Sequence, residues 1–546
     1  MKRKAVAAVL TAVMVASMFT GCGSDNGSSS AKSASAASAA SAANDTVDED
    51  GKVNGIMYQE GLPLVDEGDY TFSIFCDDSS ESGEFIMLDE FKKQTNVDVD
   101  LKIYPYETAT ERLNLDLNSG DYADVIGGWT LSDNAILTYG VNQGVFIPLE
   151  DYFEKYCPNI SAILDLPGVR EKMTAPDGHI YTIPYVCTDT TVGYSPYINT
   201  KWLENVGMSM PTTTDEFEAV LKAFKEQDAN GNGDASDEIP FSTDPNNKHI
   251  EAMAGYFGLP MNKLGIAIQN EKGVYGGVSD TYREFLSWFH KLYAEGLVDV
   301  ELYTQDSSTW EGKGNQDLYG VSIAYGSNEF TGIPAAEERG DFDSMPVLNT
   351  DKDGIWLRDT EGFSVYRTQA VITNKAEHPE IICRWFDNAF ALENGIGCNR
   401  GPVGVIVNKE DDGYHAIDTT TLSEEDQEKY SWGNLWPQSL PKYLPVDFEF
   451  VEEHPMYDEK KATEEAYEAN LTKEIIPSYW IDLDKIDTFS DTNTAIKDFF
   501  EQQQAQFVCG ELDIDNDADW QAYVDGMYSL GLEDWVATQG IEEIAK

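Results

Sequence analysis

The chain has 546 residues, of which 41% are hydrophobic and 12% aromatic, and its formal net charge at pH 7 is −60. This length exceeds a single hydrophobic core and predicts a globular protein of two lobes. The acidic excess argues against nucleic acid, anionic membrane surfaces and polyanionic ligands as partners, because long-range repulsion would slow their approach. A neutral or cationic solute is the more favourable ligand for so acidic a protein.

The first 21 residues are typical of a signal peptide. Basic residues at positions 2–4 precede an uncharged, mostly apolar run at 5–19. At about 1.5 Å per residue this run reaches roughly 22 Å, which is short of the ~30 Å hydrocarbon core of a membrane. The sequence Phe19-Thr20-Gly21-Cys22 follows and resembles the bacterial lipobox, whose cysteine receives acyl chains of the palmitate type. We therefore expect lipidation of Cys22, and the alternative is a plain secretory peptide with an incidental cysteine.

Residues 22–66 read as the lipidated cysteine and a flexible tether. Positions 23–44 are almost entirely Ser, Ala and Gly, and an acidic stretch continues to about Glu60. Some forty such residues give a reach of roughly 35 Å. A lipid anchor followed by a tether suits the outer face of a Gram-positive cell membrane, and a periplasmic anchor stays open. The remaining cysteines are scattered, which favours free buried thiols over a disulfide framework.

Strands and helices alternate from residue 70 onward. Strands are expected at 70–75, 97–104 and 124–127, with helices at 84–93 and 108–118 between them. This rhythm predicts a mostly parallel α/β sheet, in which ligands lie beyond the carboxyl ends of the strands. By this rule two groups of residues should lie together at the carboxyl edge of the sheet. They are Asp77, Asp78 and Ser79 after the first strand and Trp129, Thr130 and Asp133 after the third.

Further elements follow along the chain. Helices are expected at 213–226, 282–295, 379–392 and 520–536, and strands at 318–324 and 363–373. Thr213 is a cap residue, and Glu216 stands at capping-box spacing from it.

The segment Asp228-Ala-Asn-Gly-Asn-Gly-Asp-Ala-Ser-Asp-Glu238 has the composition of a calcium loop. Ca²⁺ takes six to eight oxygen ligands, and alternating Asp and Asn on a glycine turn bring such oxygens together. The twelfth position of an EF-hand loop would be Ile239, so this is not a true EF-hand. The candidate ligands are Asp228, Asn230, Asn232, Asp234, Asp237 and Glu238. The alternative is an Asn/Gly turn beside a helix.

Several stretches in chain order carry a family resemblance. They include Ser119-Gly-Asp-Tyr-Ala-Asp-Val-Ile, Thr174-Ala-Pro-Asp-Gly-His-Ile-Tyr-Thr-Ile-Pro, Tyr197-Ile-Asn-Thr-Lys-Trp-Leu, Met210-Pro-Thr-Thr-Thr-Asp-Glu-Phe and Asp519-Trp-Gln-Ala-Tyr-Val. With these the chain resembles the family 1 extracellular solute-binding proteins of ABC importers, in particular the long lipoproteins akin to alginate-binding proteins, and more distantly maltose-binding proteins. The resemblance covers nearly the whole mature chain.

The resemblance implies a fold and a function. The fold is α/β, with two doubly wound lobes joined by hinge strands as in type II-like periplasmic binding proteins. Lobe 1 is expected at 67–188 with a return at 363–408, lobe 2 at 189–362, and 409–546 mainly in lobe 2. The function is the capture of a carbohydrate, expected to be an oligosaccharide, by a monomer that hands it to ABC permease subunits. Alginate-binding relatives hold a structural calcium through a loop like 228–238, although this chain has one extra residue before the closing Asp-Glu pair.

Candidate solute contacts combine aromatic faces, which stack on sugars, with polar groups that bind hydroxyls. Trp129 and Tyr325 each follow a strand and resemble stacking positions of maltose-binding relatives. Trp432 and Trp436 lie in a Gly/Pro-rich segment that suits an aromatic wall. Asp78, Asp133, Trp356 and Arg358 complete the set.

An enzyme is the competing class of function. A surface glycoside hydrolase would need a pair of carboxylates, but acidic residues are too abundant for one pair to stand out. The sequence has no Gly-x-Ser-x-Gly, no His-Glu-x-x-His and no phosphate-binding glycine loop. We therefore expect a binder without catalysis, and a peptide or another organic solute stays open as its ligand.

Overall fold

The computed structural model describes residues 45–546 except 79–83, 245–248, 333–340, 418, 446–447, 449, 452–454, 477, 542 and 546. The predicted signal peptide, Cys22, most of the tether and Ser79 lie outside the described residues.

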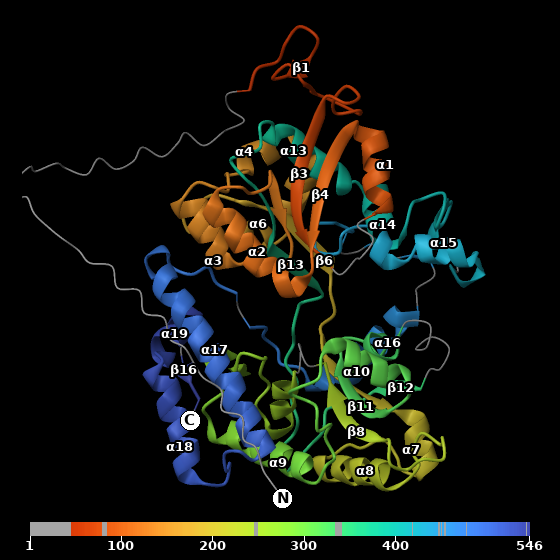
Figure 1. Cartoon of the computed structure of the whole chain (residues 1–546), viewed down its shortest axis with the longest axis vertical. Coiled ribbons are helices and arrows are strands. Elements are labelled where there is room, and N and C mark those ends of the chain that lie inside the picture. Colours follow the sequence, from red (N-terminus) through yellow and green to blue (C-terminus); the bar gives the residue numbers. More distant parts are fainter. Residues whose placement is uncertain are drawn as a thin grey trace, which may run out of the picture. The chain divides into compact units, whose positions relative to one another are not determined.

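Lobe 1 is built on a five-stranded sheet with the order β4-β3-β5-β13-β6 (Figure 1). Strands β3 (Tyr70–Asp77), β4 (Val97–Tyr104) and β5 (Val125–Gly127) are parallel, and α1 (Ile86–Thr95) and α2 (Tyr106–Ser119) connect them. Strand β13 (Phe363–Ile372) is antiparallel to β5 and to β6 (Thr182–Thr188). The predicted alternation of parallel strands and helices is confirmed, and the late strand β13 closes the sheet.

Both faces of this sheet are covered by apolar side chains. On one face Phe72, Phe91, Trp385 and Trp436 belong to the same buried cluster, and on the other Phe75 packs with Leu113. Strands that are buried on both faces are expected in a sheet with helices on each side. Further elements of this part of the chain are α3 (Asp133–Ala135), η2 (Ile136–Asn142), α4 (Glu150–Tyr156), α5 (Pro158–Leu164), α6 (Val169–Met173), α13 (Pro379–Ala389) and α14 (Leu392–Arg400).

Lobe 2 is built on a four-stranded sheet with the order β12-β7-β11-β8. Strand β11 (Tyr319–Ala324) is buried in all its residues; it runs parallel to β8 (Ile239–Thr243) and antiparallel to β7 (Ser195–Asn199). The edge strand is β12 (Phe342–Ser344).

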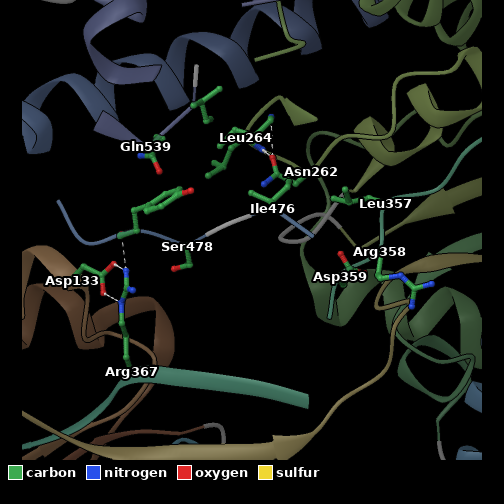
Figure 2. A pocket seen from close by; sticks show the side chains of 13 residues that line it. Asp133, Asn262, Leu264, Leu357, Arg358, Asp359, Arg367, Ile476, Ser478 and Gln539 are labelled. Atoms are coloured by element: carbon green, nitrogen blue, oxygen red, sulfur yellow. Dashed lines mark hydrogen bonds and ion pairs between the residues drawn. The ribbon is translucent and has the colours of Figure 1, made fainter. Parts of the chain in front are cut away.

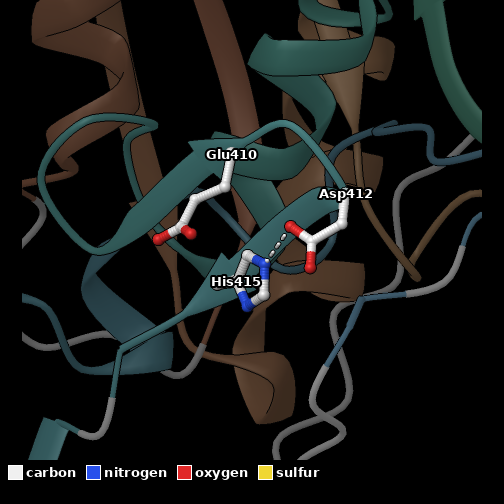
Figure 3. Close-up of side chains that lie close together, drawn as sticks. All are labelled: Glu410, Asp412 and His415. Atoms are coloured by element: carbon white, nitrogen blue, oxygen red, sulfur yellow. Dashed lines mark hydrogen bonds and ion pairs between the residues drawn. The ribbon is translucent and has the colours of Figure 1, made fainter.

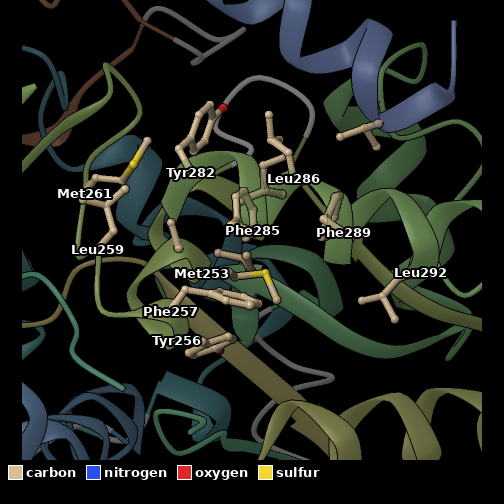
Figure 4. Close-up of a cluster of buried hydrophobic side chains, with 14 of the residues drawn as sticks. Met253, Tyr256, Phe257, Leu259, Met261, Tyr282, Phe285, Leu286, Phe289 and Leu292 are labelled. Atoms are coloured by element: carbon tan, nitrogen blue, oxygen red, sulfur yellow. The ribbon is translucent and has the colours of Figure 1, made fainter. Parts of the chain in front are cut away.

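Helices α8 (Thr214–Glu226) and α9 (Asp280–Ala294) bury one apolar face each against lobe 2. Figure 4 shows the aromatic side chains of α9 beside those of η3 (Ile250–Phe257) in this core. Thr213 caps α8 as predicted by accepting a hydrogen bond from the Glu216 N–H. The Glu216 carboxylate accepts a hydrogen bond from the N–H of Thr212 at 2.8 Å, just ahead of the helix.

The remaining elements complete both lobes and their connections. They are β1 (Lys52–Val53), β2 (Met57–Tyr58), α7 (Thr200–Val206), β9 (Ile266–Gln269), β10 (Lys272–Tyr275), α10 (Ser307–Asn315), α11 (Asn328–Thr331), β14 (Val407–Glu410), β15 (Gly413–Ala416), η4 (Thr419–Thr421), α15 (Glu424–Lys429), η5 (Trp432–Asn434), α16 (Pro455–Tyr467), η6 (Glu468–Asn470), η7 (Leu483–Lys485), α17 (Ile486–Cys509), α18 (Asp517–Ser529), α19 (Leu532–Thr538) and β16 (Glu543–Ile544).

The packing of the described residues adds detail at two of the expected boundaries. The tether does not continue to residue 66, because Val53 and Met57 of the β1–β2 hairpin are fully buried in the lobe 1 core and Asn54 donates to Glu380. The segment 409–546 is divided between the lobes. Leu440 and Ile481 pack in the lobe 1 clusters, whereas α17 to α19 contribute mainly to the lobe 2 core.

Candidate functional site

The carboxyl ends of β3 and β5 position an exposed tryptophan. Asp77 accepts hydrogen bonds from the backbone N–H groups of Trp129 (2.9 Å) and Thr130 (2.6 Å). Gly128 has φ +132°, and a Cβ there would meet the Asp77 carboxylate at 2.2 Å, so this close approach requires glycine. The Trp129 side chain remains 47% exposed. Asp77 therefore serves to hold the turn that presents Trp129.

Two tyrosines on the strands that connect the lobes extend this aromatic surface. Tyr185 of β6 and Tyr366 of β13 are paired in register, and their rings stack at 5.3 Å between centroids. The Trp129 ring meets Tyr366 edge to face at 5.4 Å. The three rings form one continuous group, which we call the aromatic wall.

Asp189 joins the aromatic wall to lobe 2. It follows β6 directly and accepts hydrogen bonds from the hydroxyls of Ser364 (2.5 Å), Tyr366 (3.3 Å) and Tyr325 (3.4 Å). Tyr325 follows β11, one of the two inner strands of the lobe 2 sheet. The two aromatic residues that sequence reasoning placed at strand ends, Trp129 and Tyr325, thus come from different lobes and lie around the same hinge strands.

Tyr194 and His249 adjoin Tyr325 on the lobe 2 side. The rings of Tyr194 and His249 stack at 4.0 Å, and Tyr194 meets Tyr325 edge to face at 6.0 Å. Burial lowers the pKa of His249 to about 4, so this imidazole is neutral at physiological pH and adds a flat aromatic face without charge.

Trp432 lies on a loop that is tied to the carboxyl end of β3. Asp78 is 3% exposed and accepts from the Gln438 N–H at 2.8 Å, while the Gln438 side chain donates to the Trp432 carbonyl at 3.0 Å. The Lys442 ammonium lies 5.2 Å from the Trp432 ring centroid. Trp432 is 55% exposed, so its ring is open to a solute, whereas Asp78 holds the loop in place.

Two of the tryptophans that sequence position favoured as solute contacts are core residues. Trp436 is fully buried and packs on Trp385 and Phe91, with ring centroids 5.7 and 5.2 Å away. Trp356 is 1% exposed and meets the Tyr467 ring edge to face. Neither ring has a face open to a solute. The Gly/Pro-rich composition around Trp436 indicated a loop correctly but carries no information on burial.

Asp133 and Arg358 line a cavity of ≈360 Å³ (Figure 2). Arg367 donates to both carboxylate oxygens of Asp133, at 2.8 and 2.5 Å, and to the Tyr479 carbonyl at 2.8 Å. Arg367 directly follows Tyr366 of the aromatic wall along β13, at the point where the pairing with β6 becomes irregular. Asp133 is thus tied through Arg367 to the strand that carries Tyr366, and its contact with a solute stays a prediction.

The predicted calcium loop lies between α8 and β8 and is closed by its own side chains. Gly233 N–H donates to Asp228 at 3.0 Å, and the amide of Asn232 donates to Asp237 at 2.7 Å. One Glu238 oxygen accepts from the Ala229 N–H, while Oε2 is buried without a hydrogen-bond partner, and burial raises the pKa of this carboxyl. A buried carboxylate oxygen without a partner beside Asp and Asn oxygens is the donor set that Ca²⁺ prefers. The residues present therefore fit this ion.

A second group of possible metal ligands lies on the β14–β15 hairpin. Figure 3 shows Glu410, Asp412 and His415, of which His415 Nε2 lies 3.0 Å from an Asp412 oxygen. Both carboxylates are exposed, and this is the one such group found among the described residues. Exposed acidic residues on a hairpin are common without an ion.

No helix among the described residues is long and apolar enough to cross a membrane. Two α/β lobes, joined by strands that carry an aromatic wall, are the architecture of a binding protein that closes on a solute. The chain belongs to the bacterial extracellular solute-binding proteins, because the sequence model of that family matches residues 78–395.

The similarity to individual members is extensive. The chain is 31% identical over 411 residues to the fructooligosaccharide ABC transporter substrate-binding protein FusA of Streptococcus pneumoniae, covering 73% of this chain and 70% of FusA. Its structure resembles FusA in complex with kestose, with a TM-score of 0.76 and 26% identity over 86% of this chain and 98% of that chain. A FusA EF-hand mutant in complex with fructo-nystose gives a TM-score of 0.72 at the same identity and coverage. The fold also matches the alginate-binding protein AlgQ2 without calcium ion, with a TM-score of 0.71 and 22% identity over 88% of this chain and 99% of that chain.

Proposed function

We propose that the protein captures a neutral oligosaccharide between its lobes and delivers it to an ABC importer. The observation that carries the proposal is the aromatic wall of Trp129, Tyr185 and Tyr366, together with Tyr325 from the other lobe. Sugar rings present apolar C–H faces that stack on such side chains, and contacts from both lobes form together only when the lobes close.

A fructooligosaccharide of the kestose type is the first ligand to test. Support comes from the relative FusA, which is named for fructooligosaccharides. The formal net charge of −60 also favours an uncharged solute over an acidic one.

We further propose that the site binds without catalysis. Glycoside hydrolysis needs two carboxylates that face the scissile bond, one of which carries a proton. Beside the aromatic wall, Asp77 and Asp78 are occupied by backbone N–H groups, and Asp189 accepts three hydroxyl groups. These carboxylates therefore shape the site rather than attack a bond.

The test is a titration of the full mature protein with kestose, paired with product analysis. Binding should stabilise the fold by about 2.7 kcal/mol at a ligand concentration one hundred times Kd, and prolonged incubation should leave kestose intact. Raffinose, an alginate oligosaccharide and an oligopeptide serve as comparison ligands. Hydrolysis of kestose, or stabilisation by the oligopeptide but by none of the saccharides, would overturn the proposal.

The loop 228–238 is proposed to hold a structural Ca²⁺. Asp228, Asn230, Asn232, Asp234, Asp237 and Glu238 would hold the ion, which supplies positive charge for the buried Glu238 oxygen. The loop connects α8 to β8, so the ion would stabilise lobe 2 and take no direct part in solute binding.

Anchoring through a lipid on Cys22 is proposed on the lipobox-like sequence alone. The protein would then stand on the outer face of the cell membrane of a Gram-positive cell, beside the permease subunits that receive the solute. The described chain begins at Asp45, whose carboxylate accepts from Tyr156 in lobe 1 at 2.8 Å, so the tether would join lobe 1.

A further inference from the structure

Three charged side chains of helix α16 contact the segment that leads from β6 into lobe 2 and the loop that follows β11. The carboxylate of Glu464 accepts from the N–H and the hydroxyl of Thr191 at 2.5 and 3.1 Å. Glu459 accepts from the N–H and the hydroxyl of Ser327, at 2.8 and 2.5 Å, just beyond Tyr325. The helix therefore fixes both the hinge segment and the loop that carries Tyr325.

Between these two carboxylates, Lys460 contacts Tyr325 and the hinge segment together. Its Nζ donates to the Gly193 carbonyl at 2.7 Å and to the Tyr325 carbonyl, and lies 4.1 Å from the centroid of the Tyr325 ring. A lysine ammonium has three N–H donors, and here two carbonyls and one aromatic face receive them. Lys460 is 4% exposed, so water does not compete for these contacts.

This arrangement determines which part of Tyr325 is left for a solute. The ammonium covers one ring face, Tyr194 meets the ring edge to face, and the hydroxyl points to Asp189. A solute that stacks on Tyr325 would have to use the face that the ammonium does not cover. Without the ammonium, the carbonyl oxygens of Gly193 and Tyr325 lose a buried hydrogen-bond donor, and the Tyr325 ring loses its cation–π contact. Both losses favour movement of the Tyr325 ring and of the hinge segment.

We propose that Lys460 is a positioning residue that holds Tyr325 and the hinge segment in the geometry that binds the solute. The proposal rests on the proposed function, because it takes Tyr325 to contact the solute. It assigns to α16 a role in affinity although no residue of this helix belongs to the aromatic wall.

The charge of Lys460 is sensitive to pH. Burial lowers its pKa to about 8, although four carboxylates oppose that effect, namely Glu459 and Glu464 on α16, Glu329 on α11 and Asp359 ahead of β13. Above this pH the neutral amine keeps only two N–H donors and turns its lone pair toward one of the two carbonyls or the ring face, so one of the three contacts is lost. Affinity for the solute should therefore be high when Lys460 is protonated and should fall as the pH rises through about 8.

The experiment measures Kd for kestose by titration calorimetry between pH 6.5 and pH 9.5. If only the form with protonated Lys460 binds, the apparent Kd equals the intrinsic Kd divided by the protonated fraction. The Kd of the wild type should therefore rise by up to about thirty-fold at pH 9.5. Lys460→Arg keeps its charge and should bind with a nearly constant Kd over this range. Lys460→Met should bind weakly at every pH, with no slope.

A measurement without ligand separates this inference from the proposed function. In protein labelled with ¹³C in lysine and tyrosine, the Tyr325 ring signals, assigned with Tyr325→Phe, should move with the Lys460 signal near pH 8 and stay constant in Lys460→Arg. Absence of kestose binding at pH 6.5 together with this joint titration contradicts the proposed function alone. The positioning role is overturned if the Tyr325 signals ignore the Lys460 titration, or if Lys460→Arg retains the wild-type slope.

Lys442 is the necessary comparison, because burial lowers its pKa to about 8 as well and its ammonium lies near Trp432. Should Lys442→Arg remove the pH slope and Lys460→Arg leave it, the slope belongs to the Trp432 side of the site and the inference is wrong.

Discussion

Replacing Trp436 by alanine should destabilise lobe 1 and leave solute affinity unchanged. The side chain is fully buried, stacks on Trp385 at 5.7 Å and meets Phe91 at 5.2 Å. Truncating a buried Trp to Ala costs about 3–5 kcal/mol, because the transfer free energy of the ring is lost and a cavity remains. For a lobe of this size that corresponds to a decrease in Tm of about 6–20 °C.

Scanning calorimetry measures the Tm, and titration with kestose well below the transition measures Kd. Trp436→Phe is the matched control, since it keeps an aromatic ring in the core and should recover much of the stability. If Trp436→Ala melts like the wild type and binds kestose ten-fold more weakly, the ring contacts the solute and our assignment of Trp436 to the core is wrong.

Three further predictions test other parts of the account. Chelation of divalent ions should lower the Tm, and Asp228→Ala should abolish the response to Ca²⁺ measured by scanning fluorimetry; a wild type that ignores Ca²⁺ makes the loop a simple turn. Cys22→Ser should move the protein from the membrane fraction to the medium with an unchanged Tm, and equal membrane retention would contradict the lipid anchor. Burial raises the pKa of Asp359 from 3.8 to about 6, so the folded state binds the extra proton and this residue makes the wild type less stable as the pH rises from about 4 to about 6. Urea unfolding should therefore show the stability of the wild type relative to Asp359→Asn falling by up to about 3 kcal/mol over that range, whereas a constant difference would contradict the shift.

The parallel part of lobe 1 could be predicted because its signals are local. The strand expected at 97–104 coincides with β4, and Trp129 lies exposed just beyond the carboxyl end of β5, although its contact with a ligand stays a prediction. The ends of helices were harder to predict from the sequence. The helix expected at 520–536 is two helices, α18 and α19, because Gly531 adopts φ +91° between them.

The residues that sequence reasoning missed depend on pairing between distant segments. Tyr185 and Tyr366 stack because β6 and β13, whose paired residues are 175 or more positions apart in the sequence, are paired in register. The alternation of Ser364 and Tyr366 along β13 was a usable signal for one shared face, but it did not identify the partner strand. The position of Lys460 beside Tyr325 could not be predicted from the sequence, because an isolated lysine on a helix is normally expected to be exposed to solvent.

The two lobes must act on one solute for the central claim to hold, and calorimetric titration of kestose with Trp129→Ala and Tyr325→Ala tests this most directly. Tyr528→Ala, which removes another exposed ring on α18, is the control for the loss of an aromatic side chain. We predict that each of the first two variants weakens binding about ten-fold or more, with little change in Tm for the exposed Trp129, because each ring supplies stacking that the other lobe cannot replace. Binding of kestose with wild-type affinity by both variants would contradict capture between these two lobes.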